Sequence, residues 1–359
     1  MTVPASWLRV GAGLAVFGVI ALVGLGALAG LEFDAALDTL ALVMVVAVPA
    51  GVVAYAAVEW AQTRRIDSIT RQFDTRTLVL MPVAMALNIV LGTAVASALK
   101  IPVYLDSIGT VLVAALAGPL AGAATGFLSN VVWTYLAPPP FQSPFAAPFA
   151  VVAVVIGLLA GTFARWGWLR PRPNASGRRL MMGGAVAIGV VAVLAVLAVS
   201  GWSSAGEEFS ATPTGSDTAL LILGWGALAL VGMAVVGLIA LLVVRRDLAT
   251  AYVVVAGTIT GVVAAFIAAP IASGIFGGVT GSGADFVIAA LRAAGAELEQ
   301  AVLGQALISD PVDKVITFFV AYLILGAMAT RTKARFPQGG YLLPMGTGDD
   351  DGTTAHATE

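Results

Sequence analysis

Long apolar stretches that carry almost no charge constrain this chain more than any other feature. A helix needs about 20 predominantly apolar residues to cross a bilayer. Charged residues make up only 11% of the chain, whereas soluble proteins carry about 25%. We therefore predict an all-α polytopic membrane protein with about ten transmembrane helices, at residues 10–30, 37–59, 78–99, 105–118, 120–136, 146–165, 180–200, 218–244, 249–276 and 311–330.

Two of these stretches, 105–118 and 120–136, are short, and Gly118-Pro119 marks the turn between them. They form either two spans or one broken, re-entrant segment. Near the start, Ala27-Leu28-Ala29 resembles a signal-peptidase site. The preceding apolar run of about 20 residues exceeds the usual 7–15 of a signal core, so we expect residues 1–29 to be retained.

The basic residues orient the predicted spans. If the N-terminus is cytoplasmic and the spans alternate, 15 of the 18 Lys and Arg residues fall on the cytoplasmic side, as the positive-inside rule requires. The outer side keeps only Lys100, Arg292 and Lys314. We therefore expect both termini to be cytoplasmic and the protein to lie in a plasma membrane, of the bacterial inner-membrane type.

The residue inventory excludes several function classes. The chain has no cysteine and a single histidine, His356, so it lacks the residues for a thiolate or imidazole metal site and for a Ser-His or Cys-His catalytic pair. A P-loop sequence is absent, and the net charge of −2 gives no indication of nucleic-acid binding. We expect no enzymatic activity, no metal and no cofactor.

Two polar segments flank the apolar ones. Residues 60–77 form a basic amphipathic linker, which would lie on anionic lipid or contact a cytoplasmic partner. Residues 336–359, with three consecutive aspartates and several Gly and Thr, are predicted to be a disordered cytoplasmic tail.

One polar patch of the predicted outer face follows residue 100. Asp106 or Ser107 could simply cap the next helix, or Tyr104 and Asp106 could contact a ligand, because tyrosine offers both a ring face and a hydroxyl. Further along, an interfacial aromatic belt would explain Trp133. It would not explain Asn130, which needs a hydrogen-bonding partner in this apolar setting.

A second outer patch covers residues 276–314. Ser282 and Asp285 have capping-box spacing, which predicts a surface helix over about 284–303 that acts as a lid. Asp310 at the N-cap and Pro311 at the first helical position would start the last span. Capping leaves several polar residues without a structural role, and we predict that they close over a ligand together with Tyr104, Asp106, Asn130 and Trp133: Thr280, Ser282, Asp285, Gln305, Asp313 and Lys314.

Small residues recur at four-residue spacing on the helix predicted at 78–99. Such residues let two helices approach closely. They serve either ordinary packing within this chain or docking against another membrane subunit. The candidates are Gly92, Ala94, Ala96 and Ala98.

Four motifs in order resemble the substrate-binding (S) components of energy-coupling factor (ECF) transporters. They are Leu87-Asn-Ile-Val-Leu-Gly-Thr93, Pro102-Val-Tyr-Leu-Asp-Ser-Ile-Gly-Thr110, Phe276-Gly-Gly-Val-Thr-Gly-Ser-Gly283 and Ile308-Ser-Asp-Pro-Val-Asp-Lys314. The resemblance implies a six-helix core with cytoplasmic termini, which maps onto helices 1–4 at 78–165 and helices 5–6 with their outer loop at 249–335. Residues 1–59 and 166–248 would then each add a transmembrane helix pair.

The resemblance also implies a function. An S component captures a vitamin or similar micronutrient at the outer face and associates with a membrane T protein and two cytoplasmic ATP-binding cassette ATPases. Its first core helix docks on the T protein through small residues, and the loops after core helices one and five close the pocket. Those loops correspond to 100–106 and 277–310 here, the two patches already selected for their polarity.

Two other classes remain open. A self-sufficient secondary transporter would carry carboxylates in mid-span and an internal repeat, and a ligand-sensing membrane protein would bind without transport. Tyr104, Trp133, Asn130 and the Asp313/Lys314 pair would suit a small organic ligand with polar and ring features, but they do not identify it.

Overall fold

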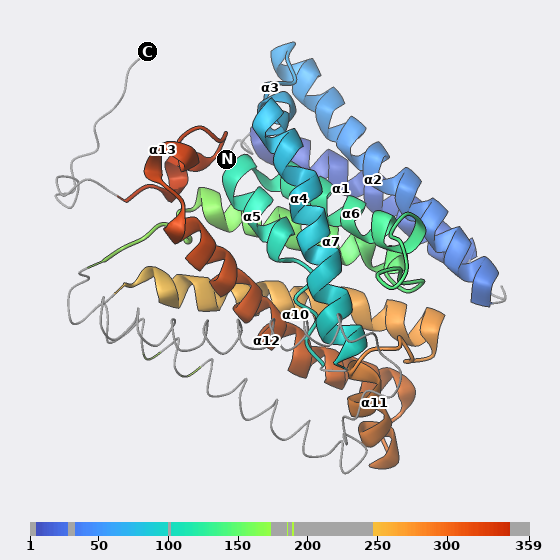
Figure 1. The fold of residues 1–359 in the computed structure, drawn as a ribbon. Helices are drawn as coiled ribbons and strands as arrows, with labels where there is room; N and C mark the ends of the chain where they lie inside the picture. Colours follow the sequence, from blue (N-terminus) through green and yellow to red (C-terminus); the bar gives the residue numbers. More distant parts are fainter. Residues whose placement is uncertain are drawn as a thin grey trace.

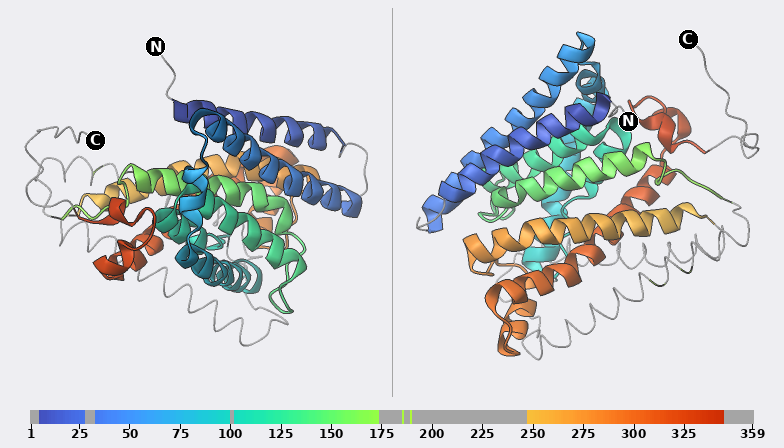
Figure 2. Two further views of the ribbon diagram at one scale, coloured as in Figure 1. Left: turned by 90° about the horizontal axis from the view of Figure 1, so that it is seen from above. Right: turned by 180° about the vertical axis from the view of Figure 1, so that it is seen from behind.

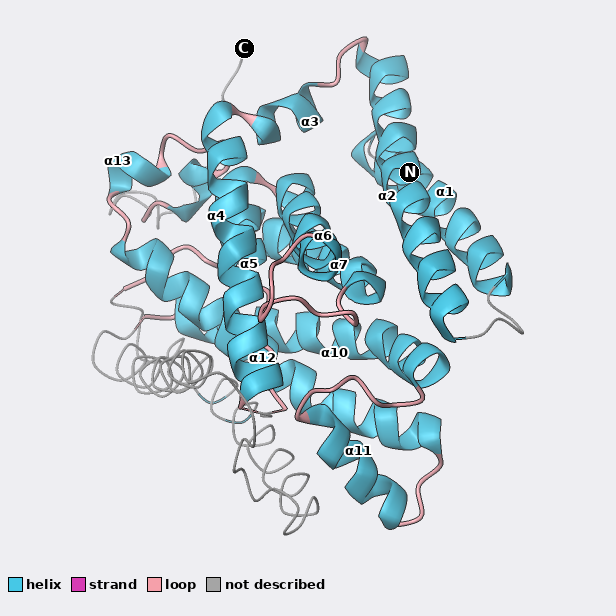
Figure 3. Cartoon of the chain, turned by 45° about the vertical axis from the view of Figure 1, so that its right-hand side comes forward, coloured by secondary structure: helices cyan, strands magenta, loops and turns pink. Residues whose placement is uncertain are grey.

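The computed structural model describes residues 5–27, 33–99, 102–173 and 247–344, together with positions 185 and 189. Within these residues the chain forms helices joined by loops, without a strand (Figure 3). Apart from those two positions, the spans predicted at 180–200 and 218–244 lie outside the described residues, as does Lys100.

Three described helices are long and apolar enough to cross a membrane: Thr75–Ala96, Ala147–Arg165 and Ala249–Phe276. A shorter apolar helix covers Ile108–Ala117. An all-helical chain with such segments is what we predicted for a helical membrane protein. The total of ten spans, the two extra helix pairs and the cytoplasmic termini stay predictions.

The first two helices form a hairpin along one flank of the bundle (Figures 1 and 2). Helix α1 covers Ala5–Ala27 and α2 covers Phe33–Thr63. Near the end of α2, the buried carboxylate of Glu59 accepts hydrogen bonds from the Arg9 guanidinium and from the backbone N–H of Ser68 at 3.3 and 3.0 Å. The hairpin is therefore tied to the linker that follows it.

The linker is anchored to the bundle by one buried glutamine. It contains two short helices, α3 at Asp67–Thr70 and η1 at Arg71–Phe73. Gln72 donates from Nε2 to the carbonyl oxygen of Ser68 at 2.6 Å, and its Oε1 accepts from the backbone N–H of Leu120 at 2.9 Å. The linker is thus packed against the start of α6 (Pro119–Tyr135), while Arg64, Arg65 and Arg71 stay exposed beside it.

The next helices are α4 at Thr75–Gly92, with its π-helical continuation η2 at Thr93–Ala98, α5 at Ile108–Ala117 and α6 at Pro119–Tyr135. Gly118 adopts a φ of +132° and Pro119 starts α6, so 105–136 contains two helices joined by a tight turn. Whether they form two spans or one broken, re-entrant segment stays a prediction. Asn88 joins the three helices. Its amide donates to Thr110 and Ser129 and accepts from the backbone N–H of Gly109, so this mid-helix amide is structural.

Glycines on two of the remaining helices allow close backbone contact with neighbouring helices. A Cβ on Gly157 of α7 (Ala150–Arg165, preceded by η3 at Ala147–Phe149) would lie 2.3 Å from the backbone nitrogen of Ala123. A Cβ on Gly261 of α10 (Ala249–Phe276) would lie 2.4 Å from the Cα of Pro311. Backbone contact at these points brings α7 against α6, and α10 against α12 (Leu298–Ala327).

Helix α12 differs from the prediction and extends over Leu298–Ala327. The helix predicted at 284–303 is broken by Gly295, which has a φ of +96°, so that α11 covers only Ala284–Ala293. Asp310-Pro311 then lies inside α12 instead of starting it. The reason is a stronger N-terminal signal upstream, because Glu297 and Gln300 form a reciprocal capping box.

The C-terminal segment is packed for longer than predicted. After α13 at Thr330–Lys333, residues 336–344 fold back as a loop with a short helix, η5, at Gly339–Leu342. The backbone N–H of Gln338 donates to the carbonyl oxygen of Leu116 at 2.8 Å, and Leu342 is fully buried. Residues 336–344 are therefore part of the bundle, and 345–359 lie outside the described residues.

The described residues that precede and follow 174–246 lie next to each other. The backbone N–H of Arg172 donates to Oδ1 of Asp247 at 2.8 Å, and that of Leu248 donates to the carbonyl oxygen of Arg172 at 3.2 Å. Tyr322 of α12 donates its hydroxyl hydrogen to Oδ2 of Asp247. The two halves of the predicted core, 78–165 and 249–335, therefore meet directly.

Candidate functional site

A cavity lies where η2, α6, α7, α10 and α12 meet the loops at 102–107 and 277–283. The space in it that can hold the centre of a water-sized sphere is about 120 Å³. Eight of the ten residues predicted to contact a ligand line it, although they come from segments up to 210 positions apart: Tyr104, Asp106, Asn130, Trp133, Thr280, Ser282, Gln305 and Lys314. The other two, Asp285 and Asp313, hold the loops that carry these side chains.

Asp313 fixes the first of these loops. It is completely buried, and its Oδ1 accepts hydrogen bonds from the backbone N–H groups of Tyr104 and Leu105 at 3.1 and 2.8 Å. Leu105 has a φ of +53°, a left-handed conformation that costs a non-glycine residue about 1 kcal/mol. The Asp313 carboxylate, on α12, therefore positions Tyr104 and Asp106 at the cavity wall.

Lys314 stands at the centre of the polar wall. Its ammonium donates to Oδ1 of Asp106 at 3.3 Å, to Oγ of Ser107 at 2.8 Å and to Oδ2 of Asp313. Ser107 also donates to Asp106 at 3.0 Å, and neither side chain caps α5. Asp106 therefore does not cap α5 but pairs with Lys314 at the cavity wall, and its contact with a ligand stays a prediction.

Two more groups on α12 face the cavity with unused hydrogen-bonding capacity. Gln305 is 5% exposed, and its Nε2 has no partner among the described residues. Asp310 is 7% exposed, lines the cavity, and makes no hydrogen bond or ion pair within the described part of the chain. The sequence suggested only a helix cap for Asp310, since an Asp-Pro pair is a common helix start.

The glycine-rich turn at 277–283 forms the part of the rim next to Tyr104. Asp285 accepts from the backbone N–H groups of Thr280 and Gly281 at 2.9 and 2.8 Å, and Gly281 has a φ of +71°. The hydroxyls of Thr280 and Ser282 are 2.9 Å apart, and Ser282 lies 3.5 Å from the phenol of Tyr104. Burial, together with the nearby charge of Asp310, raises the pKa of Tyr104 above its usual range. The phenol therefore stays protonated and able to donate.

The remaining wall is aromatic. Trp133 is buried with its Nε1 donating to Oγ1 of Thr93 at 3.1 Å, so it points inward and does not belong to an interfacial belt. Asn130 donates to the carbonyl oxygen of Gly126 at 3.0 Å. Phe145 and Phe149 pack on Phe276 with ring centroids 5.4 and 5.7 Å apart. The sequence could not single out Phe145 or Phe149, because apolar side chains are everywhere in such a chain.

The small residues of the docking hypothesis face the interior. Gly92, Ala94 and Ala96 are buried within the chain, and the side chain of Ala98 lies outside the described part. A Cβ on Gly92 would lie 2.3 Å from the ring of Trp133 and 3.1 Å from Cβ of Asp106. Ala96, on the π-helical turn, lines the cavity. In the described residues, Gly92, Ala94 and Ala96 thus pack within this chain, and docking against another subunit stays a prediction.

Within the described ranges, no group of three or more His, Cys, Asp or Glu side chains is arranged to hold a metal ion. The arrangement is suited to binding: a fixed polar wall faces aromatic rings across a cavity. Comparison with known proteins found no matching family model, no matching curated protein and no matching solved structure.

Proposed function

We propose that this protein is the substrate-binding membrane subunit of an ECF-type importer. In this role it captures a vitamin or similar micronutrient at the outer face. A T protein and two ATP-binding cassette ATPases then drive uptake, and this chain performs no chemistry itself. The observation that carries the proposal is the cavity, because the two polar patches selected from the sequence meet there although the chain separates them by about 170 residues.

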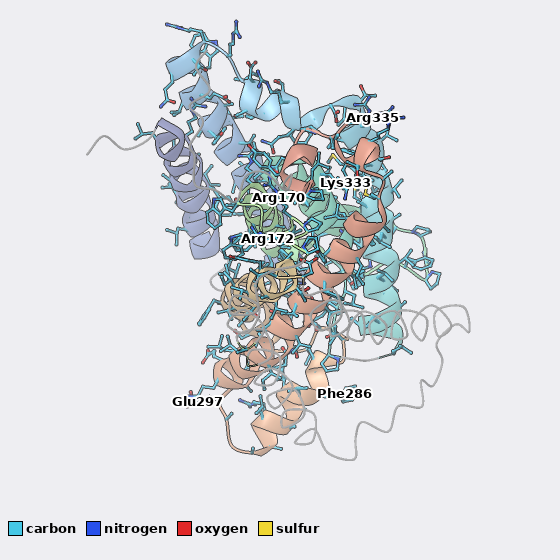
Figure 4. All side chains as sticks on the ribbon, turned by 90° about the vertical axis from the view of Figure 1, so that its left-hand side faces the viewer. Arg170, Arg172, Phe286, Glu297, Lys333 and Arg335 are labelled. Atoms are coloured by element: carbon cyan, nitrogen blue, oxygen red, sulfur yellow. The ribbon has the colours of Figure 1, made fainter. Side chains whose placement is uncertain are left out.

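The distribution of charge supports the orientation this function needs. Figure 4 places Lys333 and Arg335 toward one end of the molecule, and Glu297 and Phe286 toward the other. Glu297 and Phe286 flank the segments that form the cavity rim. An orientation with the basic end in the cytoplasm would open the cavity toward the outside.

A second candidate, a self-sufficient secondary transporter, is favoured by one observation. Asp310 and Asp313 lie in the middle of a 30-residue helix instead of at its start. Buried ionisable groups within membrane helices mark ion or proton pathways in many transporters. A self-sufficient transporter would need these carboxylates to carry the coupling ion or proton. An importer subunit would need them only to bind its substrate.

Purification followed by reconstitution separates the two candidates. The tagged full-length chain, isolated in mild detergent from its native cells, should bring down one membrane protein and two P-loop ATPases in fixed stoichiometry. The compound that co-purifies, identified by mass spectrometry, should enter proteoliposomes holding the whole complex only when ATP is supplied. Gradient-driven uptake by this chain alone, without the ATPases, would contradict the importer proposal and favour the second candidate.

A further inference from the structure

The charged groups around the cavity do not balance. Asp106, Asp310 and Lys314 line it, and Asp313 lies directly behind Lys314. Three carboxylates against one ammonium leave a formal excess of two negative charges. Among the described residues no further Lys or Arg lines the cavity. A buried excess of negative charge is costly unless a cationic partner or a bound proton neutralises it.

Lys314 does not supply a free positive charge to a ligand. An ammonium has three hydrogens to donate, and here they face Asp106, Ser107 and Asp313. A ligand carboxylate or phosphate would therefore have to displace one of these partners and add a further negative charge. The wall consequently disfavours anions although it contains a lysine.

Asp310 and Gln305 show what the wall can still bind. Nε2 of Gln305 is buried without a hydrogen-bond partner among the described residues. The Asp310 carboxylate lines the cavity and forms no hydrogen bond or ion pair with a described residue. Both side chains are more than nine-tenths buried and line the cavity. A ligand that satisfied both would present a cationic or strongly donating group to Asp310 and an acceptor to Gln305.

We propose that the cavity takes a small organic cation, with a planar ring bearing a protonated nitrogen group that pairs with Asp310. The inference rests on the proposed function and names its substrate class. A ring would lie among Trp133, Phe145 and Phe149, where aromatic side chains stack well on planar groups. A bare metal ion fits less well, because the described acidic side chains are not arranged as a metal-ligand set.

Three probes of nearly the same shape test the proposal: benzamidinium, benzamide and benzoate, with charges of +1, 0 and −1. Each is titrated into the purified full-length protein in detergent, after removal of any co-purified compound, and binding is followed by the shift in melting temperature. Benzamidinium should bind about tenfold more tightly than benzamide or better, as expected for a desolvated charge pair, and benzoate more weakly than either.

Asp310→Asn should remove the preference for benzamidinium over benzamide. Glu299→Gln is the matched control, because Glu299 is an exposed carboxylate on the same helix, outside the cavity, and this variant should keep the preference. Equal binding of the three probes, tighter binding of benzoate, or no benzamidinium binding up to its solubility limit would overturn the cation assignment. The importer proposal fails separately, if the ATPases do not co-purify, whatever the probes show.

Discussion

Two buried aspartates, Asp247 just before α10 and Asp310 within α12, have contrasting surroundings. Asp247, 5% exposed, accepts hydrogen bonds from the hydroxyl of Tyr322 and from the backbone N–H groups of Arg172 and Ala249, the last two at 2.8 and 3.0 Å. Asp310 is almost as deeply buried and accepts none from the described residues. The Asp247 carboxylate is therefore hydrogen-bonded within the fold, whereas the Asp310 carboxylate lines a cavity and can still accept hydrogen bonds.

The comparison separates structural acids from binding acids without reference to conservation. A buried polar group with all its partners in the chain stabilises the fold, and removing it leaves those partners unsatisfied. A buried group that lacks partners lowers stability and persists where function needs it. By this criterion Asp285 and Asp313 belong with Asp247, because their oxygens hold backbone N–H groups of the rim loops.

The largest expected effect is that of Asp247→Ala. It leaves the Tyr322 hydroxyl and two backbone N–H groups without an acceptor, and it releases the junction between the core halves. Unfolding in mixed micelles should show a loss of about 3 kcal/mol or more. Benzamidinium binding per folded molecule should be unchanged. A variant as stable as the parent would show that the junction does not hold the halves together.

Gly92→Leu should come next. The new side chain must occupy the space of the Trp133 ring and approach Asp106, and such overpacking costs about 2 kcal/mol. Both the melting temperature and benzamidinium binding should fall. Ala86→Leu on the exposed side of the same helix is the control, with room for the larger side chain, and it should alter neither. Loss of ATPase co-purification with probe binding intact would instead restore the docking hypothesis for Gly92.

The smallest effect on stability is expected for Asp310→Ala. The Asp310 carboxylate makes no hydrogen bond or ion pair with a described residue, so its removal breaks none. The free energy of unfolding of the ligand-free protein should therefore stay level or rise by up to about 1 kcal/mol. Comparing this variant with Asp247→Ala under the same conditions tests the distinction directly. An equal loss in both would place Asp310 among the structural acids.

Short sequence patterns predicted several residues that line the cavity, but they gave the wrong start for α12. Polarity amid hydrocarbon was enough to select Tyr104, Asn130 and Gln305. The Asp310-Pro311 pair, by contrast, has the local form of a helix start, and nothing nearby in sequence reveals that the capping box at Glu297 begins the helix earlier. Small residues at positions 92–96 likewise look the same whether they face another subunit or Trp133.

The sequence by itself determined the class of the protein, because hydropathy and charge placement are summed over many residues and survive local errors. It also determined which polar segments needed an explanation. Only the tertiary structure decided what each acid does. The backbone donors that Asp313 accepts from lie about 208 positions away, and two of the three donors to Asp247, Arg172 and Tyr322, lie 75 positions away. A carboxylate's role depends on which donors reach it, and packing of distant segments sets that.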